Sequence, residues 1–154
     1  METRITFTNQ VALVEVHPQQ QLVRLTWKGN ATGENYRGPA LAVLKAVTDF
    51  GLKYFLSDAR AMGPILYADR SWSEKEVIPK LIEAGLKRIA IVSSTDGLNV
   101  IAVDNMVNTI PMGTATVAFF DDPAMAQLWL LKNDGVEVSI PVKGTKGPQA
   151  EDVA

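Results

Sequence analysis

Residues 114–131 read TATVAFFDDPAMAQLWLL, and this stretch carries the pattern of a strand, a turn and a helix. The apolar run at 117–120 is too short for a helix and rich in β-forming side chains, which predicts a buried strand. Asp122 can cap the helix that follows, and Pro123 suits the first helical position because that position needs no N–H donor. Apolar side chains then recur at helical spacing, at Met125, Leu128 and Trp129. The stretch indicates an α/β domain but names no reaction.

The composition excludes several classes of function. The chain has 154 residues, of which 47% are hydrophobic and 21% charged, and this length suits one domain that buries roughly 70% of its unfolded surface. The net charge of -2 provides no basic field for a nucleic acid. There is no cysteine, which excludes disulfides, thiolate metal sites and cysteine nucleophiles. The first residues lack a signal-peptide pattern, and no apolar run approaches the ~18 residues of a membrane span, so we expect a cytoplasmic protein.

Strand and helix patterns alternate along the rest of the chain. Strands are predicted at residues 10–16, 21–28, 53–58, 88–93 and 136–142, and the first two are predicted to form a hairpin. Helices are predicted at 34–50, with Thr32 as its cap, at 73–84, with capping boxes at Ser71 and Ser73, and between Leu98 and Ile110. We therefore expect one α/β domain over 1–142, with a mostly parallel sheet of four or five strands, an N-terminal antiparallel hairpin strand and about four helices. The polar residues 143–154 are predicted to form a flexible tail.

No catalytic constellation is visible. His17, the only histidine, precedes a proline in a predicted turn, where such a side chain is usually solvated, and this argues against a Ser-His-Asp triad. Asp121 and Asp122 fit helix capping better than metal binding, since no further oxygen ligands are identifiable. Residues 29–33, between a strand and a helix, give a weak anion-binding signal. We expect a non-enzymatic protein with no metal and no cofactor.

The best local clue follows the strand at 53–58. Asp58 and Arg60 stand where that strand ends, which is where ligands bind in open α/β sheets, although the two side chains could equally pair with each other. The connection after them contains large apolar residues, at Met62, Ile65, Leu66, Tyr67 and Trp72. These residues are either packed against the sheet or form a lid or patch for a ligand or partner.

The order of these segments resembles the STAS superfamily, and more narrowly its SpoIIAA-like branch of anti-sigma-factor antagonists. The resemblance spans residues 22–131 and rests on four segments: LTWKG at 25–29 followed by TGENY at 32–36, YFLSDAR at 54–60, KRIAIV at 87–92, and AFFDD at 118–122 followed by Ala126 and the Trp-Leu pair at 129–130. It implies a small sheet with helices around it and no catalysis. Its members dock a kinase-like anti-sigma factor and are switched by phosphorylation of a serine that follows the aspartate of the third strand. Ala59 stands at that place here, so the usual phosphoacceptor is missing.

Two functions remain open from the sequence. The first is a regulatory module that docks a protein partner through Asp58, Arg60 and the 62–72 connection. The second is binding of a small apolar ligand such as a lipid, because the SpoIIAA-like branch is similar in architecture to CRAL-TRIO lipid-exchange domains. That ligand would lie in an enclosed apolar cavity lined by Met62, Leu66, Tyr67, Trp72 and Met106. The N-terminal hairpin also leaves an edge at which a second copy could pair to form a homodimer.

Overall fold

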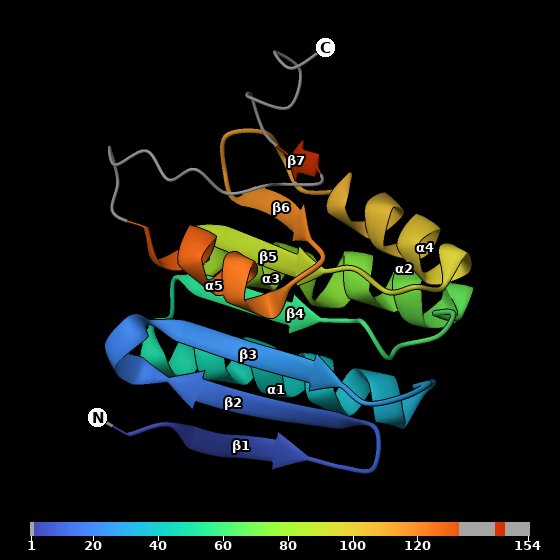
Figure 1. Ribbon diagram of the computed structural model, residues 1–154, viewed down its shortest axis with the longest axis horizontal. Coiled ribbons are helices and arrows are strands. Elements are labelled where there is room, and N and C mark those ends of the chain that lie inside the picture. Colours follow the sequence, from blue (N-terminus) through green and yellow to red (C-terminus); the bar gives the residue numbers. More distant parts are fainter. Residues whose placement is uncertain (1, 133–143, 147–154) are drawn as a thin grey trace.

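A computed structural model describes residues 2–132 and 144–146 of the chain. Within these residues a single sheet of seven strands lies in chain order, as Figure 1 shows. The strands are β1 (Arg4–Thr8), β2 (Ala12–His17), β3 (Leu22–Trp27), β4 (Tyr54–Asp58), β5 (Arg88–Val92), β6 (Thr116–Phe120) and β7 (Gly144–Lys146). Strands β3 to β6 run parallel to one another, while β1, β2 and β7 pair antiparallel with their neighbours. The predicted mostly parallel α/β sheet with an antiparallel N-terminal hairpin is confirmed.

The strand β1 was not predicted, because the first residues were considered only as a possible signal peptide. Its exposed, irregular pattern is a weak strand signal, and its register against β2 shifts between Ile5 and Phe7. The predicted hairpin of β2 and β3 forms across a short 3-10 turn at Pro18–Gln20, after which Gln21 adopts a left-handed conformation with φ 56°. Strand β1 covers the outer edge of β2, so the sheet edge on that side is β1 rather than the hairpin.

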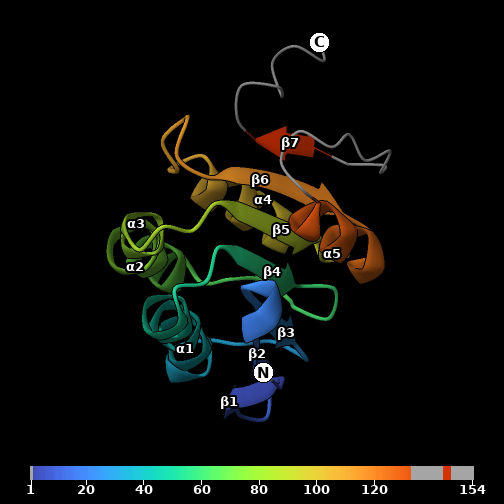
Figure 2. The ribbon, with the colours of Figure 1, turned by 90° about the vertical axis from the view of Figure 1, so that its left-hand side faces the viewer.

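Five helices cover the sheet in the described part of the chain. They are α1 (Glu34–Phe50), α2 (Tyr67–Glu76), α3 (Ile78–Glu83), α4 (Gly97–Val107) and α5 (Pro123–Leu131). Figure 2 shows α1, α2 and α3 on one side of the sheet and α5 on the other. Helix α4 belongs to the side of α1, because Val103 and Val107 pack with the larger of two cores, whereas Trp129 of α5 packs with the smaller one.

The helix ends show which capping predictions hold. Asp122 caps α5 as predicted, because its side chain accepts a hydrogen bond from the N–H of Ala124. Helix α1 has the predicted bounds, but Thr32 is not its cap: the N-cap position is taken by Gly33, which has no side chain to accept a bond. The prediction for Thr32 was wrong because Gly33, with φ 57°, adopts a backbone conformation that L side chains rarely take.

The single helix predicted at 73–84 is two helices, α2 and α3. Pro79 explains the break, because its ring lacks an N–H donor and clashes with the carbonyl four residues earlier. Val77 lies at the junction with φ -114°. Helix α2 begins six residues earlier than predicted, at Tyr67, so Ser71 and Ser73 lie inside the helix and form no capping box. Much of the predicted apolar connection is therefore helix.

The structure describes only part of the region for which a last strand and a tail were predicted. The strand predicted at 136–142 lies outside the described residues. Three residues of the predicted tail, Gly144–Lys146, form β7 and pair with β6. The division into a domain at 1–142 and a flexible tail stays a prediction.

Candidate functional site

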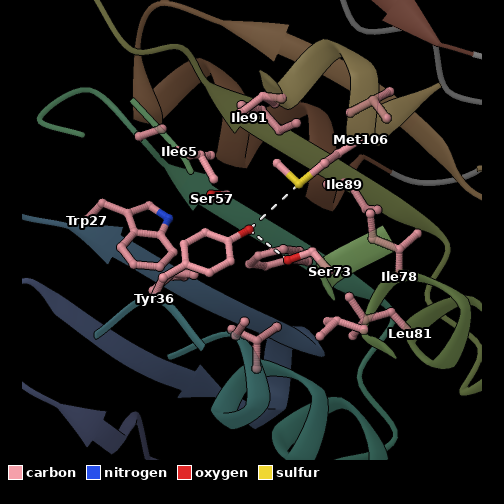
Figure 3. Close-up of a pocket in the computed structure, with 18 of the residues that line it drawn as sticks. Trp27, Tyr36, Ser57, Ile65, Ser73, Ile78, Leu81, Ile89, Ile91 and Met106 are labelled. Carbon is pink, nitrogen blue, oxygen red and sulfur yellow. Dashed lines mark hydrogen bonds between the residues drawn. The ribbon is translucent and has the colours of Figure 1, made fainter. Parts of the chain in front are cut away.

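A cavity of about 130 Å³ lies between the sheet and the helices α1 to α4. Its floor is made by alternate residues of three parallel strands, and its walls come from the helices and from the loop after β4 (Figure 3). The floor consists of Leu25, Trp27, Phe55, Ser57, Ile89 and Ile91. The walls include Tyr36, Ala40, Met62, Ile65, Ser73, Ile78, Leu81, Val103 and Met106.

Strand alternation decides which residues of β4 reach this cavity. Phe55 and Ser57 point to the cavity, whereas Leu56 belongs to the core under α5. Asp58, the next alternate residue, points to the same face as Leu56 and lies 3.8 Å from the guanidinium of Arg24, measured between Asp58 Oδ2 and Arg24 Nη2. The cavity and the Asp58 carboxylate therefore lie on opposite faces of the sheet.

A pair of hydroxyls is the main polar feature of the cavity wall. The Tyr36 hydroxyl lies 2.8 Å from the Ser73 hydroxyl oxygen and 3.7 Å from the Met106 sulfur, as the dashed lines in Figure 3 show. The Tyr36 ring stacks on Trp27 with centroids 5.5 Å apart and planes 9° apart. Burial raises the pKa of Tyr36 from 10.0 to about 12; the bond to Ser73 opposes this rise, and Asp69 and Glu74 add to it. The tyrosine is therefore a neutral hydrogen-bonding group at physiological pH.

The lining carries no charge within the described residues. Its polar side-chain groups are the hydroxyls of Tyr36, Ser57 and Ser73, the indole N–H of Trp27 and the thioether sulfurs of Met62 and Met106. No group of three or more histidine, aspartate or glutamate residues able to hold a metal ion occurs in the described ranges 2–132 and 144–146. In the same ranges, no helix combines the length and the apolar character that crossing a membrane requires.

The two helices at one side of the cavity are joined by a buried carboxylate. Asp69 of α2 accepts a hydrogen bond from the N–H of Gly33 over 2.9 Å and from Nε of Arg37 over 3.0 Å. The Arg37 guanidinium also lies 5.1 Å from the centroid of the Trp72 ring. Asp69 therefore supplies the negative charge at the start of α1, where residues 29–33 gave the weak anion-binding signal.

The predicted apolar site residues divide into two groups. Met62, Ile65 and the more distant Met106 line the cavity; the apolar-ligand hypothesis named Met62 and Met106 but not Ile65. Leu66 and Tyr67 do not line it; they are 53% and 71% exposed. Trp72 packs edge-on against Tyr36, with centroids 6.5 Å apart, and also stays outside the lining.

The loop that carries Met62 is held by two buried side chains. Ser94 Oγ donates a hydrogen bond to the Met62 carbonyl over 2.6 Å, and Asn99 Nδ2 donates to the Gly63 carbonyl over 2.9 Å. Both donors lie beyond the end of β5, one in the loop before α4 and the other in its first turn. These two bonds tie the loop that carries Met62 to the segment after β5 and to the first turn of α4.

Asp58 and Arg60 pair with each other, which was one of the two alternatives open from the sequence. Arg60 binds the carboxylate through two atoms, with Nε 3.0 Å from Oδ1 and Nη2 2.9 Å from Oδ2. Asp58 is buried, whereas the Arg60 side chain is 52% exposed. Ala59, which stands where the resemblance places a phosphoacceptor, is buried in the cavity lining.

The polar residues of the cavity were not singled out from the sequence. Ser73 was interpreted as a helix cap, and Tyr36 and Ser57 were noted only within the segments that carry the family resemblance. A tyrosine and a serine on the buried faces of neighbouring helices are a signal in themselves, because buried hydroxyls need partners. The single histidine, His17, lies outside the cavity, where its Nδ1 is 2.9 Å from Thr3 Oγ1.

The comparisons with known proteins support the architecture. The chain matches no protein-family model and no curated protein. Its structure is similar to the crystal structure of an uncharacterised protein of the DUF3478 family from Shewanella loihica, which is described as having a SpoIIAA-like fold. The fold is SpoIIAA-like. The TM-score is 0.52 at 20% sequence identity, and the match covers 83% of this chain and 93% of that one.

This likeness confirms the SpoIIAA-like architecture that the four sequence segments predicted. At 20% identity it concerns the fold alone, and a fold hosts many functions. The function therefore has to be argued from the cavity and the surface of the SpoIIAA-like domain itself.

Proposed function

We propose that this protein binds a small apolar molecule in the cavity between the sheet and helices α1 to α4. The observation that supports the proposal is the cavity itself, because close-packed protein interiors have few voids larger than a water molecule. An apolar pocket with a few polar groups is the usual form of a small-molecule site. The lining offers neither a carboxylate nor an imidazole to act as a base, and this supports a non-enzymatic role. The proposal also includes a regulatory role in the cytoplasm.

The volume of the cavity limits the ligand. An apolar cavity of about 150 Å³ engineered into another protein binds benzene, whereas drug-sized ligands fill pockets of roughly 300 Å³ or more. At about 130 Å³, this cavity suits one six-membered ring or a comparable branched hydrocarbon. A whole lipid exceeds this volume, so the lipid considered from the sequence gives way to a smaller molecule.

The methionines provide a direct test of binding. Met62 and Met106 line the cavity, whereas Met112 is exposed and Met125 lies in α5 on the opposite face of the sheet. We expect benzene, added to protein with ¹³C-labelled methionine methyls, to shift the resonances of Met62 and Met106 and to leave those of Met112 and Met125 in place. Absence of any shift at Met62 and Met106 up to the solubility limit of benzene would contradict the proposal.

A variant that fills the cavity provides the second test. Ala40 faces the cavity from α1, and replacing it with leucine places three more carbons in the space. We expect Ala40→Leu to abolish the benzene response without lowering the melting temperature, because each newly buried methylene contributes about 0.8 kcal/mol. Ala42→Leu makes the same change on the same helix outside the lining, and it should keep the response.

A second candidate function is docking of a protein partner, the hypothesis that ranked first from the sequence. The exposure of Leu66 and Tyr67 at the start of α2, close in sequence to the half-exposed Arg60, favours it. The test compares proteins that co-purify with the wild type and with a Leu66→Ser/Tyr67→Ser variant. Leu128→Ser serves as the control, because Leu128 is exposed on α5. A partner that the first variant loses and the control keeps would support docking there; equal retention would contradict it.

A further inference from the structure

The hydroxyl pair of the cavity has one hydrogen more than it needs. Tyr36 and Ser73 together carry two O–H hydrogens, and one of them joins the two oxygens over 2.8 Å. If Ser73 donates that bond, the Tyr36 hydrogen faces the Met106 sulfur at 3.7 Å. A thioether is a weak acceptor, so this donor is poorly satisfied. A ligand oxygen that replaced the sulfur as acceptor would gain a full hydrogen bond.

The charges around the cavity select against an ionised ligand. The lining residues are neutral, so a buried carboxylate or ammonium group would have no counter-ion there. Two carboxylates act against an anion as well, because the negative charges of Asp69 and Glu74 contribute to the raised pKa of Tyr36. Both are already paired, Asp69 with Arg37 over 3.0 Å and Glu74 with Arg70 over 3.6 Å.

The structure assigns to this cavity an uncharged ligand about the size of one ring that presents an oxygen acceptor to the hydroxyls of Tyr36 and Ser73. Cyclic ketones, lactones and small esters or ethers have this chemistry, whereas free acids and amines do not. The carbon skeleton of the ligand contacts the apolar floor, and its oxygen accepts the hydrogen bond that the Met106 sulfur accepts only weakly. This inference rests on the proposed function, because it specifies the ligand of the same cavity.

Three cyclohexane derivatives test the inference at neutral pH. Cyclohexanone has an acceptor, methylcyclohexane has none, and cyclohexanecarboxylate is ionised. Affinities are measured from the methyl resonances of Met62 and Met106. We expect cyclohexanecarboxylate to bind at least about tenfold more weakly than cyclohexanone, because burial of an unpaired charge is costly.

The variant Tyr36→Phe isolates the hydrogen bond. It keeps the ring that stacks on Trp27 and removes the hydroxyl. We expect it to weaken cyclohexanone binding about fivefold, the value of one neutral hydrogen bond, and to leave methylcyclohexane binding unchanged. Tyr67→Phe removes an exposed tyrosine hydroxyl outside the cavity and should change neither affinity. Each ligand is compared with itself across variants, so the different water solubilities of the two molecules cancel.

A second variant should change the affinity for cyclohexanone in the opposite direction. Its result does not depend on whether Tyr36→Phe folds. Met106→Leu removes the competing sulfur and keeps the Met62 methyl as a probe. We expect it to raise the affinity for cyclohexanone relative to methylcyclohexane. An unchanged or lower ratio would overturn the inference, as would cyclohexanecarboxylate binding as well as the ketone, or Tyr36→Phe leaving the ketone affinity intact.

The failure of the inference and the failure of the proposed function give different results. Suppose that methylcyclohexane and cyclohexanone both bind and that Tyr36→Phe changes neither affinity. The cavity then binds ligands without a hydrogen bond to their oxygen, and only the inference is overturned. If none of the three molecules shifts either methyl, the proposed function and the inference fall together. Binding of methylcyclohexane alone overturns the inference and leaves the proposed function intact.

Discussion

The carboxylate of Asp69 in α2 accepts a hydrogen bond from the backbone N–H of Gly33, which stands at the N-cap position of α1. Asp69 lies 36 residues from Gly33 in the chain and is only 2% exposed. Because α1 has no side-chain cap of its own, a carboxylate from another helix satisfies one of its first N–H groups and complements its dipole. The same contact fixes the two helices that carry Tyr36 and Ser73, and so it sets the geometry of the hydroxyl pair.

Replacing Asp69 with asparagine should therefore destabilise the domain. The variant removes the charge that pairs with Arg37 and weakens the bond to Gly33, so we expect the free energy of unfolding to fall by about 2 kcal/mol. Chemical denaturation measures this change. Asp49→Asn is the matched control, because Asp49 pairs with Lys45 at an exposed site, where such pairs contribute less than about 1 kcal/mol. Equal losses in the two variants would contradict a special role for Asp69.

The ionisation of Tyr36 predicts how stability depends on pH. Folding raises its pKa from 10.0 to about 12, so between these values the folded state keeps a proton that the unfolded state has released. This contribution is fully present below pH 10 and is lost as pH rises through 12, and it amounts to about 3 kcal/mol. Stability measured against pH in this window should fall less steeply in Tyr36→Phe than in the wild type. The exposed control Tyr67→Phe should follow the wild type, and identical slopes for all three proteins would refute the prediction.

The sequence predicted correctly those helices and strands whose position depends on residues within the element itself. The unit at 114–131 has β6 and α5 where they were predicted, because a β-rich apolar run, Asp122 and Pro123 act within a few residues of one another. The signal at the end of α1 is equally local, because Gly51 ends that helix with φ 63°. The break at Pro79 was missed, although it too is a local signal, because serine–glutamate spacing was given more weight.

The candidate site could be predicted only in part, because it depends on contacts between distant residues. Strand alternation puts Ser57 and Asp58 on opposite faces of the sheet, and the cavity lies on the Ser57 face. The hydroxyl pair joins residues 36 and 73, and no spacing rule connects them. The sequence also grouped Asp58 with the 62–72 connection, since both follow one strand, yet the carboxylate points to the α5 face and Met62 to the cavity.

The loop that carries Met62 should depend on Asn99. Asn99 is 1% exposed and donates to the carbonyl of Gly63, so Asn99→Ala leaves that buried carbonyl without its partner. We expect a loss of about 1–3 kcal/mol in the free energy of unfolding and a broadened methyl resonance for Met62. Asn105→Ala makes the same change at an exposed position of the same helix, where we expect no loss. A stable Asn99→Ala protein with a sharp Met62 signal would show that Ser94 alone holds the loop.

The separation of the two sheet faces predicts that stability and ligand binding respond differently to Arg60→Ala. This variant removes the two hydrogen bonds to the buried Asp58 carboxylate and leaves Arg24 at 3.8 Å as its cationic neighbour. We expect the free energy of unfolding to fall by about 2 kcal/mol, because a buried charge loses its main partner. Lys80→Ala, which breaks an exposed pair with Glu76, should cost less than about 1 kcal/mol.

The benzene-induced shifts of Met62 and Met106 should persist in Arg60→Ala, since these residues lie across the sheet from Asp58. Loss of those shifts in a folded Arg60→Ala protein would mean that the two faces act as one site, as the sequence first suggested.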